Sequence, residues 1–231
     1  ARPSSFIYFT ARAISALEVN KESPMFHVLP RQENITPQQR QRFEDIATST
    51  LGHFTDIGAI ATLLPVKRPV RLLGTALTVR IPHVDGSIIR EALTMARPGD
   101  VLVIDVGSDV QRACWGEFRA YAALQKSLAG VVTNGSVTDW AHLSQLTLPT
   151  FARGTSPLTT RALSLEGEIN TPITIEGCAV TPGDLIIGDD DGLFVIPPHR
   201  AEALASAAEK KQAQENEKRR ALRAKHPAWF C

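Results

Sequence analysis

The sequence predicts one α/β domain with a parallel sheet in its central part and antiparallel strands in its later part. Two observations support this prediction. Short apolar runs such as "VLVIDVG" (residues 101–107) alternate with helical segments between residues 72 and 153, as expected for strands buried on both faces and joined by helical crossovers. Between residues 173 and 197, apolar runs alternate instead with tight turns, which is typical of hairpins.

The first elements follow from local sequence signals. A helix is expected to begin at Thr36 and Pro37, because Thr is a good N-cap and Pro is favoured at the first helical position. Residues 72–79 alternate in polarity and are rich in Thr, which predicts a strand. Residues 86–96 predict a short helix that ends at the turn residues 97–100.

The next segments repeat this alternation and complete the parallel part. After the strand at 101–107, the sequence predicts a helix at 116–130, a buried strand at 130–133, a helix at 139–146 and a strand at 148–153. The resulting βαβαβ order implies parallel strands with right-handed crossovers.

The antiparallel part contains two turn signals. "TPGD" (181–184) is a Pro-Gly turn, and "DDDG" (189–192) lies between two apolar runs as a hairpin turn would. Three successive acids could also bind a cation or reach the site of a neighbouring subunit. We favour the hairpin, which is the simpler interpretation.

The two ends of the chain differ from its centre. Residues 1–34 are interpreted as an N-terminal extension, 35–198 as the α/β domain and 199–231 as a helical tail. Residues 1–24 contain arginines and serines and no acid before Glu18, as a weak organellar transit peptide would. The alternative is a vector remnant or an upstream start before a native start at Met25, and we favour this second interpretation.

Composition limits the class of protein. Of the 231 residues, 43% are hydrophobic and 21% are charged, which is typical of a soluble globular domain. The net charge of +1 gives no overall attraction to nucleic acid, and no apolar run is long enough to span a membrane. Three unpaired cysteines fit a reducing compartment, so a cytoplasmic location is expected.

Several kinds of active site are absent from the sequence. It has no Gly-rich phosphate loop, no His-x-x-x-His pair and no Gly-x-Ser-x-Gly elbow. No lysine lies in a segment that predicts a dry pocket, as a Schiff-base enzyme would require.

One candidate site remains at the ends of two neighbouring parallel strands. The predicted helix after Gly116 offers the backbone amides of Gly116, Glu117, Phe118 and Arg119 to an anion. The next strand ends at Thr138 and Asp139, and ligands of open α/β sheets bind at such strand ends. Asp139 could hold Mg²⁺ or could simply cap the helix that follows, and its spacing alone favours the cap.

Six segments, taken in order, resemble the RraA-like family: "GTALTV", "PGDVLVIDVG", "WGEFRAYAAL", "AGVVTNGSVTDW", "PTFARGTSP" and "GCAVTPGDLIIGDDDGLFVIP". This family includes 4-hydroxy-4-methyl-2-oxoglutarate aldolases, oxaloacetate decarboxylases and the regulator of ribonuclease E activity. The resemblance implies a swivelling β/β/α domain that assembles as a homotrimer or as a hexamer of trimers.

The resemblance also implies functional roles for the candidate residues. The loop from Gly116 to Arg119 would bind a small 2-oxo acid, and Asp139 would bind Mg²⁺ or Mn²⁺. The metal would stabilise a pyruvate enolate during retro-aldol cleavage or oxaloacetate decarboxylation. Asp139 then becomes the expected metal ligand, and it could still cap a helix.

Two positions depart from the aldolase pattern. Thr138 replaces an arginine that would pair with substrate charge, and His142 replaces an acid. The sequence therefore leaves three alternatives: a metal-dependent lyase for 2-oxo acids, a non-catalytic binding protein, or an enzyme of the same fold with another substrate. Arg119 or Arg153 could supply the missing charge.

Overall fold

The structure is a computed structural model of the 231-residue chain and describes residues 25–32, 35–82 and 84–229. The interpretation of residues 1–24 falls outside these described residues. Within them, no helix is long and apolar enough to cross a membrane.

Four parallel strands form the centre of the molecule, as the sequence predicts. They are β4 (Leu72–Arg80), β5 (Asp100–Asp105), β7 (Gly130–Thr133) and β9 (Thr150–Ala152). Every residue of β5 is buried, which explains its continuous apolar run.

The flanking strands of this sheet are short or antiparallel. They are β2 (Ala59–Ile60), β3 (Leu64–Pro65), β14 (Leu185–Asp189) and β15 (Gly192–Ile196). The order of the main sheet is β2-β15-β14-β4-β5-β7-β9-β3. In addition, β11 (Glu166–Ile169) pairs with β4, and β1 (Met25–Val28) pairs with β11. Residues 25–28 therefore join the sheet, although they lie in the segment interpreted as an N-terminal extension.

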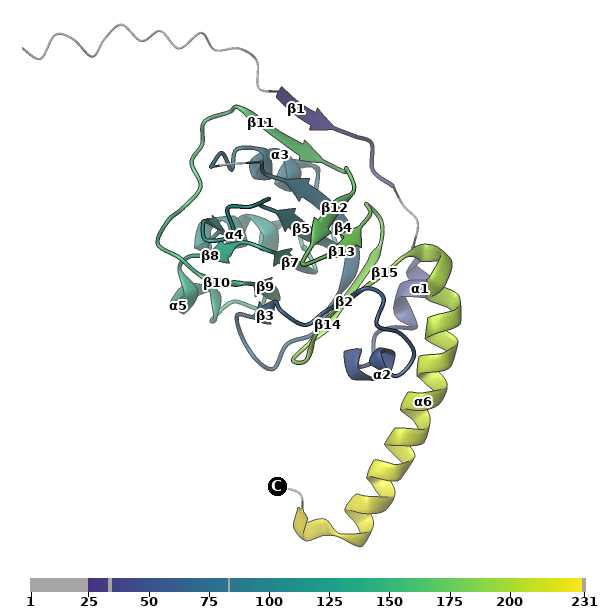
Figure 1. The fold of residues 1–231 in the computed structure, drawn as a ribbon. Coiled ribbons are helices and arrows are strands. Elements are labelled where there is room, and N and C mark those ends of the chain that lie inside the picture. Colours follow the sequence, from purple (N-terminus) through teal and green to yellow (C-terminus); the bar gives the residue numbers. More distant parts are fainter. Residues whose placement is uncertain (1–24, 33–34, 83, 230–231) are drawn as a thin grey trace, which may run out of the picture.

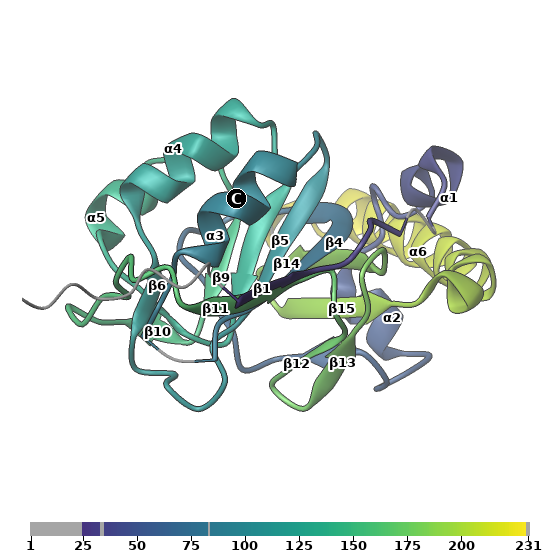
Figure 2. The ribbon, with the colours of Figure 1, turned by 90° about the horizontal axis from the view of Figure 1, so that it is seen from above.

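Three helices cover one face of the parallel strands (Figure 2). They are α3 (Ile88–Met95), α4 (Glu117–Gln125) and α5 (Trp140–Leu143). Leu102 and Ile104 point toward this layer, whereas Val101 and Val103 belong to the core on the opposite face. The helix predicted at 139–146 is shorter in the structure and ends at Leu143.

The antiparallel part contains both predicted turns. The turn at 181–184 links β13 (Cys178–Val180) to β14, and the turn at 189–192 joins β14 to β15 in a hairpin. A second hairpin, which the sequence analysis did not predict, joins β12 (Ile173–Ile175) to β13. Asp189, in the second turn, accepts hydrogen bonds from the backbone N–H and the hydroxyl of Thr48 at 2.7 and 2.5 Å. Asp190 accepts one from the Val70 N–H at 2.9 Å. These two acids therefore stabilise the fold around the hairpin.

The remaining helices lie toward the β14–β15 side of the main sheet (Figure 1). They are α1 (Pro37–Gln41), α2 (Thr48–Gly52) and α6 (Pro198–Lys225), followed by the short helix η1 (Pro227–Trp229). Thr36 caps α1 in a capping box, as predicted. Only the first part of α6 contributes buried residues, and the rest extends away from the sheet (Figure 1).

A second, three-stranded sheet positions the candidate site. It contains β6 (Ala113–Trp115), β8 (Ser136–Val137) and β10 (Gly154–Thr155), which the sequence did not predict. Trp115 pairs with Val137, and the Thr138 N–H donates to the Trp115 carbonyl at 2.9 Å. This pairing brings Gly116, at the start of α4, next to Thr138 and Asp139.

Candidate functional site

Asp139 does not cap the helix that follows it. Its backbone is left-handed, with φ 54° and ψ 37°, and its side chain makes no capping hydrogen bond to α5. Instead, its Oδ2 accepts a hydrogen bond at 3.0 Å from the backbone N–H of Glu117, the first residue of α4. The capping role suggested by spacing is therefore wrong for α5. The carboxylate faces the positive end of a different helix.

A left-handed conformation is uncommon for a residue with a side chain and costs about 1–2 kcal/mol. Four other described residues with side chains have positive φ, so the observation alone is not diagnostic. Its consequence at Asp139 is specific, because this residue brings a carboxylate to the start of α4.

Gly116 allows this close approach. A Cβ atom at position 116 would lie 2.6 Å from Asp139 Oδ2 and 2.7 Å from Thr138 Cγ2. Any larger residue would push both side chains away from α4. The Thr138 hydroxyl lies 3.4 Å from Asp139 Oδ1, so Thr138 contacts the carboxylate by a long hydrogen bond.

We expect Gly116→Ala to displace the Asp139 carboxylate and to weaken any ligand that binds it. The measurement is calorimetric titration with Mn²⁺, in which the affinity of the variant should fall by about tenfold or more, since misplaced ligands commonly cost 10–100-fold. Gly154→Ala is a matched control, because a Cβ at Gly154 would meet no atom within 4 Å. Equal affinities in both variants would contradict the proposed packing role.

The side chain of Glu117 forms a small network beside this contact. The Tyr121 hydroxyl donates to Glu117 Oε1 at 2.5 Å, and His142 Nδ1 lies 3.4 Å from the same oxygen. The hydrogen bond raises the pKa of Tyr121. His142, which replaces the acid of the aldolase pattern, thus contacts an acid supplied by α4.

All the predicted site residues except Glu117 border one cavity of about 170 Å³. Gly116, Phe118, Arg119, Thr138 and Asp139 line it, together with Ala113, Cys114, Trp115, Thr159 and Thr160. Phe118 is 81% exposed, and Cys114 is fully buried. Burial raises the pKa of the Cys114 thiol, which makes this cysteine a poor nucleophile.

Arg119 is the cation in the wall of this cavity. Its guanidinium donates to the Cys114 carbonyl, to the Thr160 hydroxyl at 3.2 Å and to the Gly86 carbonyl at 3.1 Å. All three acceptors are neutral, and three of the five guanidinium N–H donors are used in this way. Burial lowers the pKa of Arg119, but an arginine remains protonated at neutral pH.

Comparison with known proteins identifies the family. Residues 47–195 match the family model described as RraA-like, Aldolase/RraA, and this match covers more than half of the chain. The chain belongs to the RraA-like family. The fold class expected from the resemblance is therefore confirmed.

Several curated relatives of this RraA-like protein are named after one activity. A protein of Halalkalibacterium halodurans, provisionally named a 4-hydroxy-4-methyl-2-oxoglutarate aldolase, is 34% identical over 183 residues, covering 78% of this chain and 87% of the relative. The 4-hydroxy-4-methyl-2-oxoglutarate aldolase of Thermus thermophilus is 32% identical over 127 residues, covering 55% of this chain and 76% of the relative.

Solved structures share the fold at lower identity. Streptomyces coelicolor RraAS2, an unusual member of the RNase ES inhibitor RraA protein family, superposes with a TM-score of 0.71 at 22% identity, covering 81% of this chain and 98% of that chain. The RNA-processing inhibitor RraA of Thermus thermophilus gives 0.59 at 27% identity, covering 65% and 91%. Aldolases and RNA-processing inhibitors thus both occur among the relatives of this RraA-like protein.

The donor set around Asp139 is compatible with Mg²⁺ and poor for a tightly held transition metal. Within the described residues, no three His, Cys, Asp or Glu side chains gather as a metal site would require. Mg²⁺ needs fewer protein ligands, because it keeps several waters and often binds through one or two carboxylates and the substrate. Asp139 is exposed and Oδ1 has only the long contact to Thr138, so one carboxylate oxygen can accept such a cation.

A buried carboxylate fixes the wall behind Arg119. Asp85 is fully buried and accepts hydrogen bonds from the Ser87 hydroxyl and from the N–H groups of Ser87, Leu163 and Leu165. Asp85 therefore joins the turn that holds Gly86 to the segment that follows Thr160. Burial alone would raise the pKa of Asp85, but these four hydrogen bonds together lower it to about 2.

The low pKa of Asp85 predicts a specific loss of stability in acid. A carboxyl with a depressed pKa stabilises the fold fully above its unfolded value of about 3.9, and the contribution disappears as the pH falls toward 2. Asp85→Asn should lower the free energy of unfolding by about 2 kcal/mol at pH 7 and by much less near pH 2. Urea titration at several pH values checks this, and an equal loss at pH 7 and pH 2.5 would contradict it.

Some site residues escaped the sequence analysis. Tyr121 lies four residues after Glu117, a spacing that places both side chains on one face of a helix and could have suggested the pair. Thr160 and Gly86 gave no local signal, because they reach Arg119 from distant segments. Trp115 lines the cavity, and its buried indole nitrogen has no hydrogen-bond partner among the described residues. Arg153, the other arginine considered for the missing charge, instead pairs with Glu176 at 2.5 Å.

Proposed function

We propose that this RraA-like protein is a divalent-metal-dependent lyase that acts on a small 2-oxo acid. It would either cleave the acid by a retro-aldol step, which releases pyruvate, or decarboxylate oxaloacetate. The main support is that the carboxylate of Asp139 and the guanidinium of Arg119 border the same small cavity. A carboxylate suits a metal ion, and a guanidinium suits a substrate carboxylate.

The size of the cavity favours a small substrate. About 170 Å³ is below the roughly 300–1,000 Å³ typical of pockets for drug-sized ligands. A short dicarboxylic acid fits a cavity of this volume better than a nucleotide does. The exposed ring of Phe118 at the cavity wall leaves the site open to solvent in a single chain.

Each residue has a chemical role in this proposal. The first-turn amides of Phe118 and Arg119 lack partners within α4 and would receive a substrate carboxylate, while the Glu117 amide holds Asp139. Asp139 would hold Mg²⁺ or Mn²⁺. When bound, that cation would supply Lewis-acid stabilisation of developing negative charge. Thr138 would contribute one neutral hydroxyl beside Asp139, which is weaker than a charged donor.

A non-catalytic binding protein is the second candidate, and Thr138 is the observation that favours it. The cavity lacks a second arginine, and Arg119 already donates to three neutral oxygens. Such a site would bind an oxo acid more readily than it would stabilise the charge of a transition state.

A pyruvate assay separates the two candidates. Purified protein is incubated with oxaloacetate, 4-hydroxy-4-methyl-2-oxoglutarate and other oxo acids, and lactate dehydrogenase with NADH reports pyruvate. The lyase proposal expects metal-dependent pyruvate release that chelation by EDTA removes and Mg²⁺ restores. If pyruvate forms from every oxo acid no faster than it does in buffer with metal and no protein, the binding protein is favoured.

The expected assembly is a homotrimer or a hexamer of trimers. The open cavity and the partly uncovered helix α6 both leave surface that subunit contacts could bury. Multi-angle light scattering should give about three or six times the chain mass of 25.1 kDa at micromolar concentration, since interfaces of obligate size persist there. A monomer mass throughout would contradict this expectation.

A further inference from the structure

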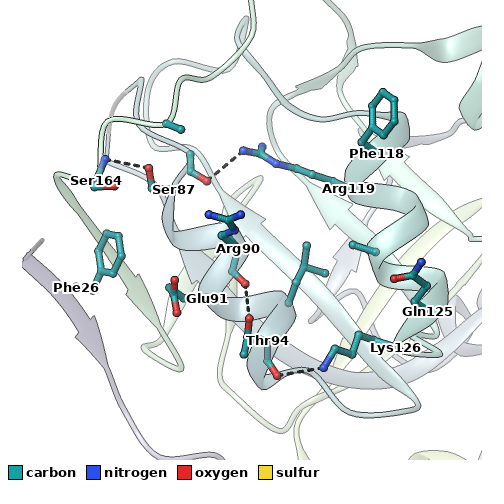
Figure 3. A pocket seen from close by; sticks show the side chains of 14 residues that line it. Phe26, Ser87, Arg90, Glu91, Thr94, Phe118, Arg119, Gln125, Lys126 and Ser164 are labelled. Atoms are coloured by element: carbon teal, nitrogen blue, oxygen red, sulfur yellow. Dashed lines mark hydrogen bonds between the residues drawn. The ribbon is translucent and has the colours of Figure 1, made fainter.

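A groove of about 700 Å³ lies between α3 and α4, behind the wall that holds Arg119 (Figure 3). It is larger than the candidate cavity and within the range of pockets for organic ligands. The side chains of α3 and α4 form its two long sides, and Phe26 of β1 closes one end. Phe118 and Arg119 border both this groove and the candidate cavity.

Cationic side chains outnumber acids along the groove. Arg90, Arg119 and Lys126 line it, and Glu91 is the one acid among the lining residues. No ion pair within the described residues engages Arg90, and Lys126 makes only a long hydrogen bond of 3.4 Å to the Thr94 carbonyl. The groove therefore has an excess of positive charge with donors that a ligand can use.

The rest of the surface suits an apolar or aromatic group. The Phe26 ring lies at one end of the groove, and Phe118, Leu93 and Ala122 also line it (Figure 3). The small side chain of Ala122 leaves room between the helices. A ligand for this groove would thus combine an anionic group with an aromatic or apolar part.

Arg119 lies between the groove and the candidate cavity and contacts residues that line each of them. Its Nη2 donates to the Gly86 carbonyl, and Gly86 lines the groove, whereas its Nη1 donates to Cys114 and Thr160, which line the cavity. A Cβ at Gly86 would lie 2.8 Å from Arg119 Nη2, so the guanidinium is packed tightly between the two spaces. Arg119 therefore lies at the boundary of the two spaces, and its charge adds to the positive potential of the groove.

We propose that the groove between α3 and α4 is a second binding site, for a small aromatic or apolar molecule that carries a carboxylate, phosphate or sulfonate group. The anionic group binds to the cationic side chains that line the groove, Arg90 on α3 and Lys126 on α4, and the apolar part lies against Phe26 and Leu93. This site is distinct from the cavity at Asp139 and does not depend on the proposed lyase activity.

The test uses 8-anilinonaphthalene-1-sulfonate as an aromatic anion in metal-free buffer. The wild-type chain should give a saturable rise in fluorescence, and phenyl phosphate should displace the probe while benzyl alcohol at the same concentration should not. Arg90→Gln with Lys126→Gln should weaken binding of the probe about tenfold, because two charge-assisted contacts are lost. The matched control, Lys218→Gln with Arg220→Gln, removes the same charge from exposed positions of α6 and should leave the affinity unchanged.

Three results would overturn the proposal. One is equal weakening in both double variants, which would show only a general effect of charge. The second is displacement by benzyl alcohol as effective as by phenyl phosphate. The third is a change of mass in light scattering for Arg90→Gln with Lys126→Gln, which would identify the groove as a subunit contact. Circular dichroism spectra identical to wild type establish that each variant is folded, and Arg90→Lys should retain binding of the probe.

Discussion

Asp139→Ala is expected to remove the binding of Mg²⁺ or Mn²⁺ and to lower kcat/KM for oxo-acid cleavage by about 10³. The physical reason is that Asp139 is the one carboxylate among the described residues that line the candidate cavity, so none of the other lining side chains can replace it as an anionic ligand. Removing one preorganised group that stabilises transition-state charge already costs about 10²–10³ in rate. Calorimetric titration measures the first effect, and the coupled pyruvate assay measures the second.

Asp139→Asn is the control for the structural role of this side chain. The amide oxygen can still accept the hydrogen bond from the Glu117 N–H, so the variant keeps the contact at the start of α4 but loses the charge. It should unfold at a temperature close to that of wild type and still fail to bind the metal. Asp139→Ala should lose stability as well, by about 1 kcal/mol, as expected when a helix N-terminus loses its acceptor.

Asp191→Ala is the matched control for the loss of one exposed acid. Asp191 lies in the β14–β15 turn and does not line the cavity. Its replacement should leave both metal affinity and turnover unchanged. Metal binding of equal strength in wild type, Asp139→Asn and Asp139→Ala would refute the assignment of Asp139 as the ligand.

The central sheet could be predicted from the sequence because strands that are buried on both faces consist largely of apolar residues. The strands β5 and β7 lie in runs of apolar residues, and the turns and helices between the central strands follow the usual connection lengths. The helix α6 was equally predictable, since its Ala-, Glu- and Lys-rich composition favours helix without help from tertiary contacts. The small sheet of β6, β8 and β10 was not predictable, because strands of two or three residues show no periodicity.

The orientation of the Asp139 side chain could not be predicted from the sequence around it. An acid before "WAHL" has the signature of an N-cap, and nothing nearby in the sequence indicates a left-handed backbone. The partner of its carboxylate is the N–H of Glu117, 22 residues earlier in the chain. Arg119 is similar, since its partners Gly86 and Thr160 come from two distant loops. Contacts between distant segments of the chain therefore determine the positions of both side chains.

Thr138→Arg is expected to raise kcat/KM for oxaloacetate by about 10², because a guanidinium at this position can hold a substrate carboxylate and offset charge in the transition state. The wild-type cavity has only Arg119, whose donors are largely engaged by neutral oxygens. We therefore expect slow turnover by the wild-type chain. Thr138→Lys is a useful comparison, since it adds the same charge without the planar fork and should give a smaller gain.

The gain from Thr138→Arg should depend on the metal ligand and not on Arg119. Thr138→Arg with Asp139→Ala should be inactive, while Thr138→Arg with Arg119→Lys should keep most of the gain. A different outcome would assign the substrate contact to another arginine. If the wild type already turns over at the rate of the aldolases and Thr138→Arg slows it, Arg119 supplies this contact. In that case, Arg119→Lys alone should lower kcat/KM. If Thr138→Arg changes the rate for no oxo acid while metal still binds, the lyase proposal fails and the binding protein is favoured, because a charged fork beside a bound cation would have no reaction to assist.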